Sequence, residues 1–157
     1  MLKDFEPFKQ ERGTNCFPTA VRAVLRWYGY DISPDEASAW CLEDPLGCPI
    51  EMGIAELSEH LDLSLLGEEA ENEIKSRVND PDEPSPVIVT IRSPLAPPRT
   101  LHAVVVIGVG SVLIEGNEDE RVFFMDPISG QIEQDGCVSF WQKWDFAGRT
   151  ALVIDPR

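Results

Sequence analysis

The sequence predicts an α+β protein in which helices occupy the first half of the chain and strands occupy the second. Before residue 80, apolar residues recur every three or four positions, as on one face of a helix. After residue 86, they form short β-branched runs separated by loops rich in Pro and Gly, which is typical of strands. Because the two kinds of segment do not alternate along the chain, we do not expect a βαβ arrangement.

Four helices are expected in the first half. The first begins at Cys16, with Pro18 in its first turn, and ends before Gly29. The second begins after Ser33, which stands three positions before Glu36 as in a capping box. Helical spacing of apolar residues predicts the third and, more weakly, the fourth. The expected helices cover residues 16–28, 34–42, 50–61 and 68–78.

The second half is expected to be mainly strands. Two buried strands are predicted on either side of a Pro-rich loop at 93–99. The segment from 112 to 125 is expected to form a hairpin that turns at 116–119. The expected strands cover 87–91, 103–107, 112–115, 121–125 and 151–154, and one more short helix is expected at 138–144.

The length and the charge of the chain exclude several classes of protein. A chain of 157 residues is the size of one domain. Thirteen Lys and Arg against 28 Asp and Glu give a net charge of −15, which excludes a surface for nucleic acid or for anionic membranes. No apolar run resembles a signal peptide or reaches the roughly 20 residues of a membrane span. We therefore expect a cytoplasmic protein whose four cysteines are thiols.

The negative charge is concentrated in the middle of the chain. Residues 1–30 hold five basic and three acidic side chains, residues 31–85 hold two and 16, and residues 86–157 hold six and nine. The segment charges are therefore +2, −14 and −3. Such a segment can simply be a solvated face, but it can also provide one acidic wall of a binding site for a cationic peptide or amine.

Cys16 and His102 are the candidate nucleophile and general base. Cys16 begins a helix, where unpaired N–H groups and the helix dipole favour a thiolate. His102 opens a buried strand, whereas the only other histidine, His60, lies in an acidic helical segment and is expected at the surface. An imidazolium near Cys16 would lower the pKa of its thiol further. The alternative is that Cys16 is a small core residue and His102 an ordinary strand-end residue.

Two more polar residues could complete such a site. Asp126 ends a predicted strand at an Asp-Pro turn and could accept the second ring N–H of His102. Gln10, six residues before Cys16, could donate its side-chain N–H to an oxyanion together with the backbone N–H of Cys16. We expect no metal, because the cysteines and histidines form no C-x-x-C or H-x-x-x-H pair, and no cofactor.

These residues, in this order, resemble the papain-like peptidases of the double-glycine-leader, bacteriocin-processing type. The resemblance runs from about residue 8 to residue 154. It rests on Gln10, Cys16-Phe17-Pro18-Thr19-Ala20, Tyr28-Gly29-Tyr30-Asp31-Ile32-Ser33, His102-Ala103-Val104-Val105-Val106 and Asp126-Pro127-Ile128-Ser129-Gly130. It implies one papain-like domain over 1–157, with a helical lobe at about 10–80 that carries the Cys helix. An antiparallel sheet lobe at about 86–157 would carry His102 and Asp126.

The resemblance implies a role for each candidate residue. Cys16 would be the nucleophile, His102 the base and then the acid, Asp126 the group that orients His102, and Gln10 an oxyanion donor. The sequence departs from the family pattern at Phe17, where the family commonly has Gly, so we expect the Phe17 ring at the wall of the cleft, in contact with substrate. The long hairpin before Asp126 makes Asn117 a rival partner for His102.

Three functions remain open from the sequence. The first is a cysteine peptidase that cleaves a peptide or protein substrate, with the double-glycine preference that the resemblance implies. The second is an acyltransferase or amidase that uses the same Cys16 and His102, since the Cys helix also resembles papain-like acyltransferases of antibiotic biosynthesis. The third is a papain-like binding module without catalysis, with its cleft closed by Phe17.

Overall fold

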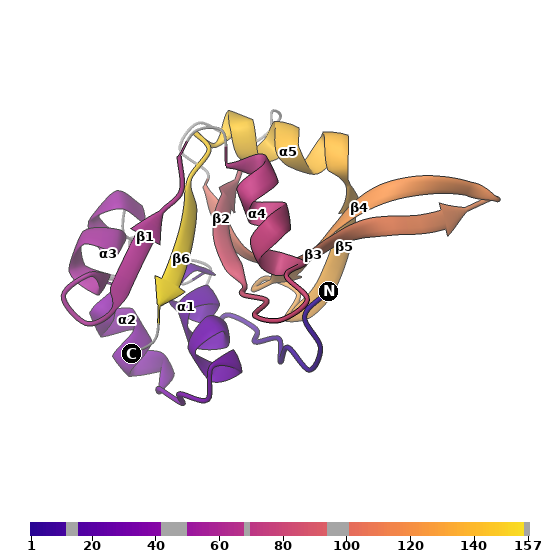
Figure 1. The fold of residues 1–157 in the computed structure, drawn as a ribbon. Coiled ribbons are helices and arrows are strands. Elements are labelled where there is room, and N and C mark those ends of the chain that lie inside the picture. The colour runs from indigo at the N-terminus through magenta and orange to yellow at the C-terminus, as the bar shows by residue number, and fades with distance from the viewer. Residues whose placement is uncertain (12–15, 42–49, 68–69, 94–100, 156–157) are drawn as a thin grey trace.

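The computed structural model describes residues 1–11, 16–41, 50–67, 70–93 and 101–155. Within these ranges the chain forms five helices and six strands (Figure 1). The helices are α1 (Cys16–Trp27), α2 (Pro34–Trp40), α3 (Ile50–Leu57), α4 (Glu71–Val78) and α5 (Cys137–Phe146). The strands are β1 (Asp62–Leu65), β2 (Val87–Ile91), β3 (His102–Ile114), β4 (Asn117–Asp126), β5 (Gln131–Gly136) and β6 (Ala151–Asp155).

The six strands form one sheet in the order β1-β6-β2-β3-β4-β5. Every neighbouring pair is antiparallel. The sequence did not predict the two edge strands, β1 and β5. Both are short and largely polar or exposed, as edge strands usually are, and they lack the β-branched run that marks the buried strands. Because β1 joins the sheet beside β6, the sheet includes residues from the half of the chain in which only helices were expected.

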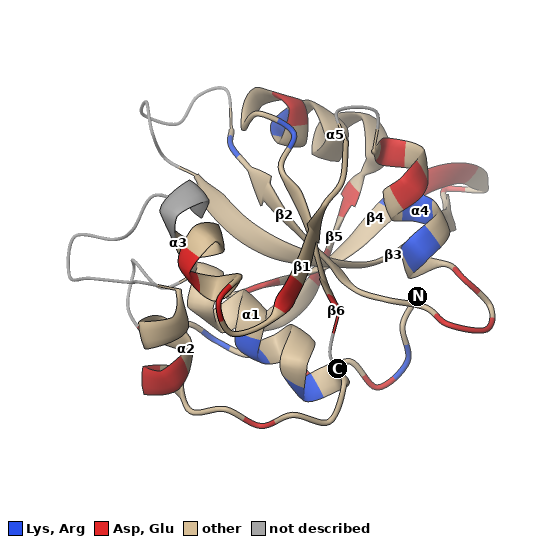
Figure 2. Cartoon of the chain, turned by 60° about the vertical axis from the view of Figure 1, so that its left-hand side comes forward, with Lys and Arg blue, Asp and Glu red and all other residues tan. Residues whose placement is uncertain are grey.

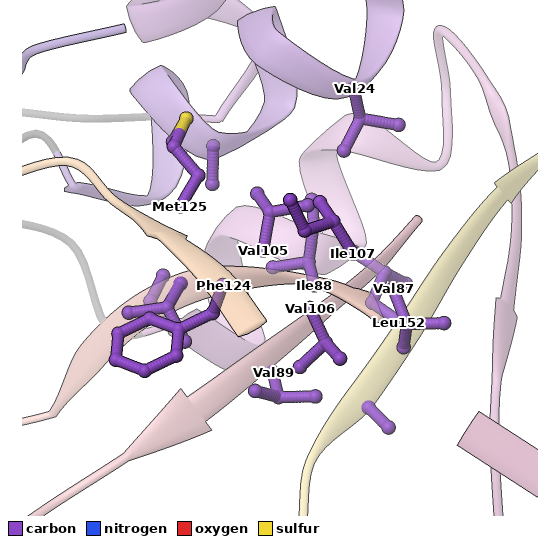
Figure 3. Packing of buried hydrophobic residues seen from close by; sticks show 14 of the residues in the cluster. Val24, Val87, Ile88, Val89, Val105, Val106, Ile107, Phe124, Met125 and Leu152 are labelled. Atoms are coloured by element: carbon purple, nitrogen blue, oxygen red, sulfur yellow. The ribbon is translucent and has the colours of Figure 1, made fainter. Parts of the chain in front are cut away.

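Helices cover both faces of this sheet. Figure 3 shows Val24 of α1 on the same side of the sheet as Val105 and Met125, whereas Phe124 points to the other side. There the Phe124 ring contacts Phe140 of α5, with 5.1 Å between ring centroids. The apolar alternation along β3 and β4 therefore fills two core layers, one beneath α1 and one beneath α5.

Local sequence signals explain where the first two helices begin and end. The Ser33 hydroxyl accepts a hydrogen bond of 3.0 Å from the backbone N–H of Glu36, which is the predicted N-cap of α2. Gly29, with a φ of 94°, follows the end of α1 and provides the left-handed conformation that stops a helix. Helices α3 and α4 are shorter than predicted, and helix α5 is longer by one residue before Val138 and two after Trp144.

The β3–β4 hairpin is longer than predicted and projects from the body of the molecule (Figure 1). Its turn is Glu115-Gly116, with φ values of 51° and 80°, rather than 116–119. Two residues with positive φ are what a tight turn between twisted strands requires. Strand β5 pairs only with residues 121–126 of β4, so the outer part of the hairpin is a two-stranded ribbon. Where the ribbon leaves the sheet, Glu120 of β4 forms a 2.7 Å ion pair with Lys75 of α4.

Candidate active site

The topology of the sheet brings His102 and Asp126 together. His102 is the first residue of β3, and Asp126 is the last residue of β4. Because β3 and β4 are antiparallel neighbours, both residues lie at the same end of the sheet. They are 24 positions apart in sequence, and the chain between them forms the long hairpin, which folds away from this end. The length of the hairpin therefore does not disturb the approach of the two side chains.

His102 Nε2 and Asp126 Oδ1 are 2.7 Å apart. Both side chains are mostly buried, with 19% and 24% of their surface exposed. Burial alone would lower the pKa of His102, but its hydrogen bonds with Asp126 and Cys16, and the charges of both partners, raise that pKa from 6.5 to about 9. The imidazole is therefore held as an imidazolium at neutral pH.

Cys16 begins α1 and lies beside His102. Its Sγ accepts a hydrogen bond of 3.5 Å from the backbone N–H of Ala103, the residue after His102. Burial raises the pKa of the Cys16 thiol, yet hydrogen bonds from His102 and Ala103, with the charge of His102, lower that pKa below 9.0 overall. Because Nε2 of His102 is bonded to Asp126, Nδ1 is the ring nitrogen left for the sulfur. The pair thus favours a thiolate beside an imidazolium.

A turn in the backbone holds the Asp126 carboxylate in place. Its Oδ1 accepts a second hydrogen bond, of 2.9 Å, from the backbone N–H of Ile128. Burial raises the pKa of Asp126, but the bonds from His102 and Ile128 and the charge of His102 lower it overall. The N–H of Gly130 closes the turn on the Asp126 carbonyl at 2.8 Å. The carboxylate is therefore ionised and oriented before any substrate binds.

The N-terminal segment carries Gln10 to this end of the sheet. The backbone N–H of Leu2 donates to the Ile107 carbonyl at 2.8 Å, and the N–H of Gln10 donates to the Pro127 carbonyl at 2.8 Å. Gly130 lies against Lys9 so closely that a Cβ there would come within 2.6 Å of the Lys9 Cβ. Gln10 therefore lies beside the Asp126 turn. Residues 12–15, which connect this segment to Cys16, are outside the described ranges.

Two other candidates have different positions from those expected. Asn117 pairs with Ile114 at the tip of the ribbon, so it is Asp126 and not Asn117 that contacts His102. Phe17 is only 6% exposed and belongs to the core. Helix α3 packs closely against the Phe17 ring, because a Cβ added to Gly53 would lie 3.2 Å from that ring. The expected place at the cleft wall is thus wrong, because the core offers the ring more apolar contact.

Two backbone donors of the site, the N–H groups of Ile128 and Ala103, were not predicted from the sequence. Ile128 is two residues after Asp126, and its N–H donates to the Asp126 side chain, as in the turns that Asp commonly begins. The Asp-Pro turn signal could therefore have suggested this bond. The N–H of Ala103 bonds Cys16 only because two distant segments meet, so no local pattern indicates it. Within the described ranges, no three His, Cys, Asp or Glu side chains gather as metal ligands would. The same ranges hold no helix long and apolar enough to cross a membrane.

A family model matches this chain over residues 2–152, and its description is the Peptidase_C39 like family. The chain belongs to the Peptidase_C39 like family. No curated protein matches this C39-like chain. The match extends across Gln10, Cys16, His102 and Asp126.

Two solved structures share the fold of this C39-like chain. One is the peptidase domain of Streptococcus ComA, described as a bi-functional ABC transporter involved in quorum sensing. It is 15% identical, with a TM-score of 0.71 over 98% of this chain and 99% of that one. The other is described as a C39-like peptidase from Bacillus anthracis. It is 14% identical, with a TM-score of 0.71 over 100% of this chain and 97% of that one. These similarities confirm the predicted papain-like α+β fold.

Proposed function

We propose that the chain is a cysteine peptidase in which Cys16 is the nucleophile, His102 the general base and acid, and Asp126 the residue that orients His102. The observation that carries this proposal is the chain of contacts from Asp126 through His102 to Cys16. A lowered thiol pKa beside a raised imidazole pKa is the electrostatic state that a nucleophilic thiolate needs. Membership of the C39-like family supports the same activity.

Each step of the reaction uses a group of the site. The Cys16 thiolate attacks the peptide carbonyl carbon, a C–S bond forms, and the carbonyl oxygen becomes an oxyanion. The backbone N–H of Cys16 and the side chain of Gln10 would donate to that oxyanion. The His102 imidazolium gives its proton to the leaving amine as the C–N bond breaks. His102 then takes a proton from water, which hydrolyses the thioester and frees Cys16.

The substrate that we propose is a cationic peptide. Helices α2 and α3 and strands β1 and β6 carry acidic residues but neither Lys nor Arg within their bounds, and acidic positions are red along these elements in Figure 2. A field of this sign attracts basic peptides and repels acidic ones. We also propose that the protein acts in the cytoplasm, because the mechanism requires Cys16 to remain a reduced thiol.

The structure weakens one of the alternatives. A binding module without catalysis was suggested by a Phe17 ring that closes the cleft, but Phe17 lies in the core. An acyltransferase or amidase would use the same thioester and differ only in the acceptor.

The test is to incubate the chain with basic peptides that contain a Gly-Gly bond and to follow cleavage and intact mass. We expect a peptide acid as product and a transient acyl adduct on Cys16 in wild type, and neither in Cys16→Ala. Formation of an amide only when an amine is added would favour the acyltransferase. No product with any peptide or amine, from a folded protein, would contradict the proposal.

A further inference from the structure

A cavity lies at the far end of α1 from Cys16. Its volume is about 350 Å³, and it is bordered by the end of α1, by α2, by the segment after α3, and by β1 and β6. Leu25 of α1 lines it, nine residues after Cys16, which corresponds to about 13 Å along a helix. None of the residues that we assign to catalysis contributes to its lining. The cavity therefore needs a separate explanation.

One wall of this cavity is aromatic. The rings of Trp40 and His60 are stacked with their centroids 4.9 Å apart and their planes only 7° apart. Tyr30, which is 46% exposed, lines the same cavity. Large aromatic rings are normally covered when a core is available, so an open aromatic wall is a surface that a ligand can use. The face of an aromatic ring attracts cations, and a flat guanidinium can stack on it.

The lining of the cavity is also acidic. Asp62 of β1 and Asp155 of β6 both line it, and they are directly opposite each other in the strand register. Glu59 adds a third carboxylate, and none of the ten described lining residues is Lys or Arg. These carboxylates give the lining acceptor groups that a cation can bind.

We propose that this cavity binds an arginine side chain of a peptide. Its guanidinium would stack on the Trp40 and His60 wall and bond the carboxylates of Asp62 and Asp155. Arginine fits better than lysine, because a planar fork of donors can satisfy two carboxylates and an aromatic face together. The volume suits one side chain rather than a whole peptide segment.

The position of the cavity relates this arginine to the proposed cleavage. An extended peptide spans about 3.3 Å per residue, so the separation of about 13 Å corresponds to at least four residues or so. The arginine would therefore be bound well away from the scissile bond. That the peptide is the substrate rests on the proposed function, whereas the binding itself does not.

The test measures binding of N-acetyl-argininamide by calorimetry at low salt, with N-acetyl-citrullinamide as the neutral probe of equal shape. We expect the arginine probe to bind at least tenfold more tightly than the citrulline probe. The Asp155→Asn variant should lose at least tenfold in affinity. The matched control is Glu118→Gln, which removes one charge from the exposed ribbon and should bind as wild type does. Equal binding of both probes, or unchanged binding in Asp155→Asn, would overturn the proposal.

Two further measurements keep the result interpretable. If Asp155→Asn does not fold, the Trp40 indole signal of wild type is followed by NMR during titration, and it must shift with the arginine probe but not with the citrulline probe. Methylguanidine distinguishes an arginine residue of a peptide from a free guanidinium compound. If methylguanidine binds as tightly as N-acetyl-argininamide, the ligand is a free small cation and the peptide assignment is overturned. Cys16→Ala should bind as wild type does, so failure of catalysis and failure of this site are distinguishable.

Discussion

The His102 imidazole and the Asp126 carboxylate are joined by a 2.7 Å contact between the first residue of β3 and the last residue of β4. This contact fixes which ring nitrogen faces Cys16, because Nε2 is occupied. It also opposes the effect of burial, which alone would make the imidazole neutral. The antiparallel sheet therefore sets both the orientation and the charge of the group that activates the thiol.

The first prediction concerns Asp126. Replacing Asp126 by Asn keeps the shape of the side chain but removes the negative charge that favours the imidazolium. Peptide cleavage should fall on the order of 10²-fold, the lower range for loss of a general acid or base. Asn117→Ala, at the tip of the ribbon, is the control and should leave cleavage unchanged. A larger loss in Asn117→Ala than in Asp126→Asn would contradict the assignment.

The second prediction concerns stability and pH. In the folded protein the pKa of His102 is raised to about 9 and the pKa of Cys16 is lowered below 9.0. The raised pKa of His102 makes the free energy of unfolding fall as the pH rises from about 6.5 to about 9, whereas the lowered pKa of Cys16 makes it rise as the pH approaches 9.0. The two contributions have opposite signs, so the free energy of unfolding of wild type should fall less with pH than His102 alone would make it fall.

The Cys16→Ala variant removes that compensation. The raised pKa of His102 then stands alone, held by Asp126, so its stabilisation is complete below pH 6.5 and is lost as the pH rises toward the folded pKa. Urea unfolding at several pH values should therefore show a stability that declines more steeply above pH 6.5 in Cys16→Ala than in wild type. Parallel curves for the two proteins would show that Cys16 and His102 are not coupled.

The third prediction concerns the segment that carries Gln10. Gly130 has a φ of 67°, and a Cβ there would lie 2.6 Å from the Lys9 Cβ. Gly130→Ala should therefore cost more than the roughly 1–2 kcal/mol of a left-handed alanine and should reduce cleavage by displacing Gln10. Gly116→Ala is the matched control, because φ is 80° but nothing lies within 4 Å of its Cβ. Equal effects of the two substitutions on cleavage would contradict this role for the segment.

The fourth prediction concerns ionic strength. If the acidic surface attracts cationic substrates, kcat/KM for a basic Gly-Gly peptide should fall as salt rises from about 0.01 to 1 M, since the screening length shortens from about 30 to 3 Å. A neutral peptide of the same length serves as the control and should be much less sensitive. A flat salt response for the basic peptide would remove the proposed preference.

Much of the fold was predictable because local patterns carry it. The capped start of α2 at Ser33 and the stop of α1 at Gly29 are encoded within a few residues, and both were predicted. Strands β1 and β5 were not predicted, because an edge strand depends on the neighbour that it pairs with rather than on its own apolar pattern.

The site shows the same division. Cys16, His102 and Asp126 were identified because a helix start, a strand start and a strand end are visible in the sequence, and the structure places them together. The position of Phe17 was not visible, since α3, which covers it, is distant in sequence. The cavity beside Trp40 was not predicted either, because it is bordered by elements from four separate parts of the chain.

The most direct test of the proposed thiolate–imidazolium pair is the rate of Cys16 alkylation by iodoacetamide as a function of pH, read by peptide mapping. In wild type, Cys16 should react rapidly well below pH 9, because its pKa is lowered. Cys137, whose pKa burial and nearby carboxylates raise to about 11, is the internal control and should react slowly. In His102→Ala, rapid reaction of Cys16 should begin only above pH 9, since burial then dominates its pKa. The same pH profile for Cys16 in both proteins would contradict the account.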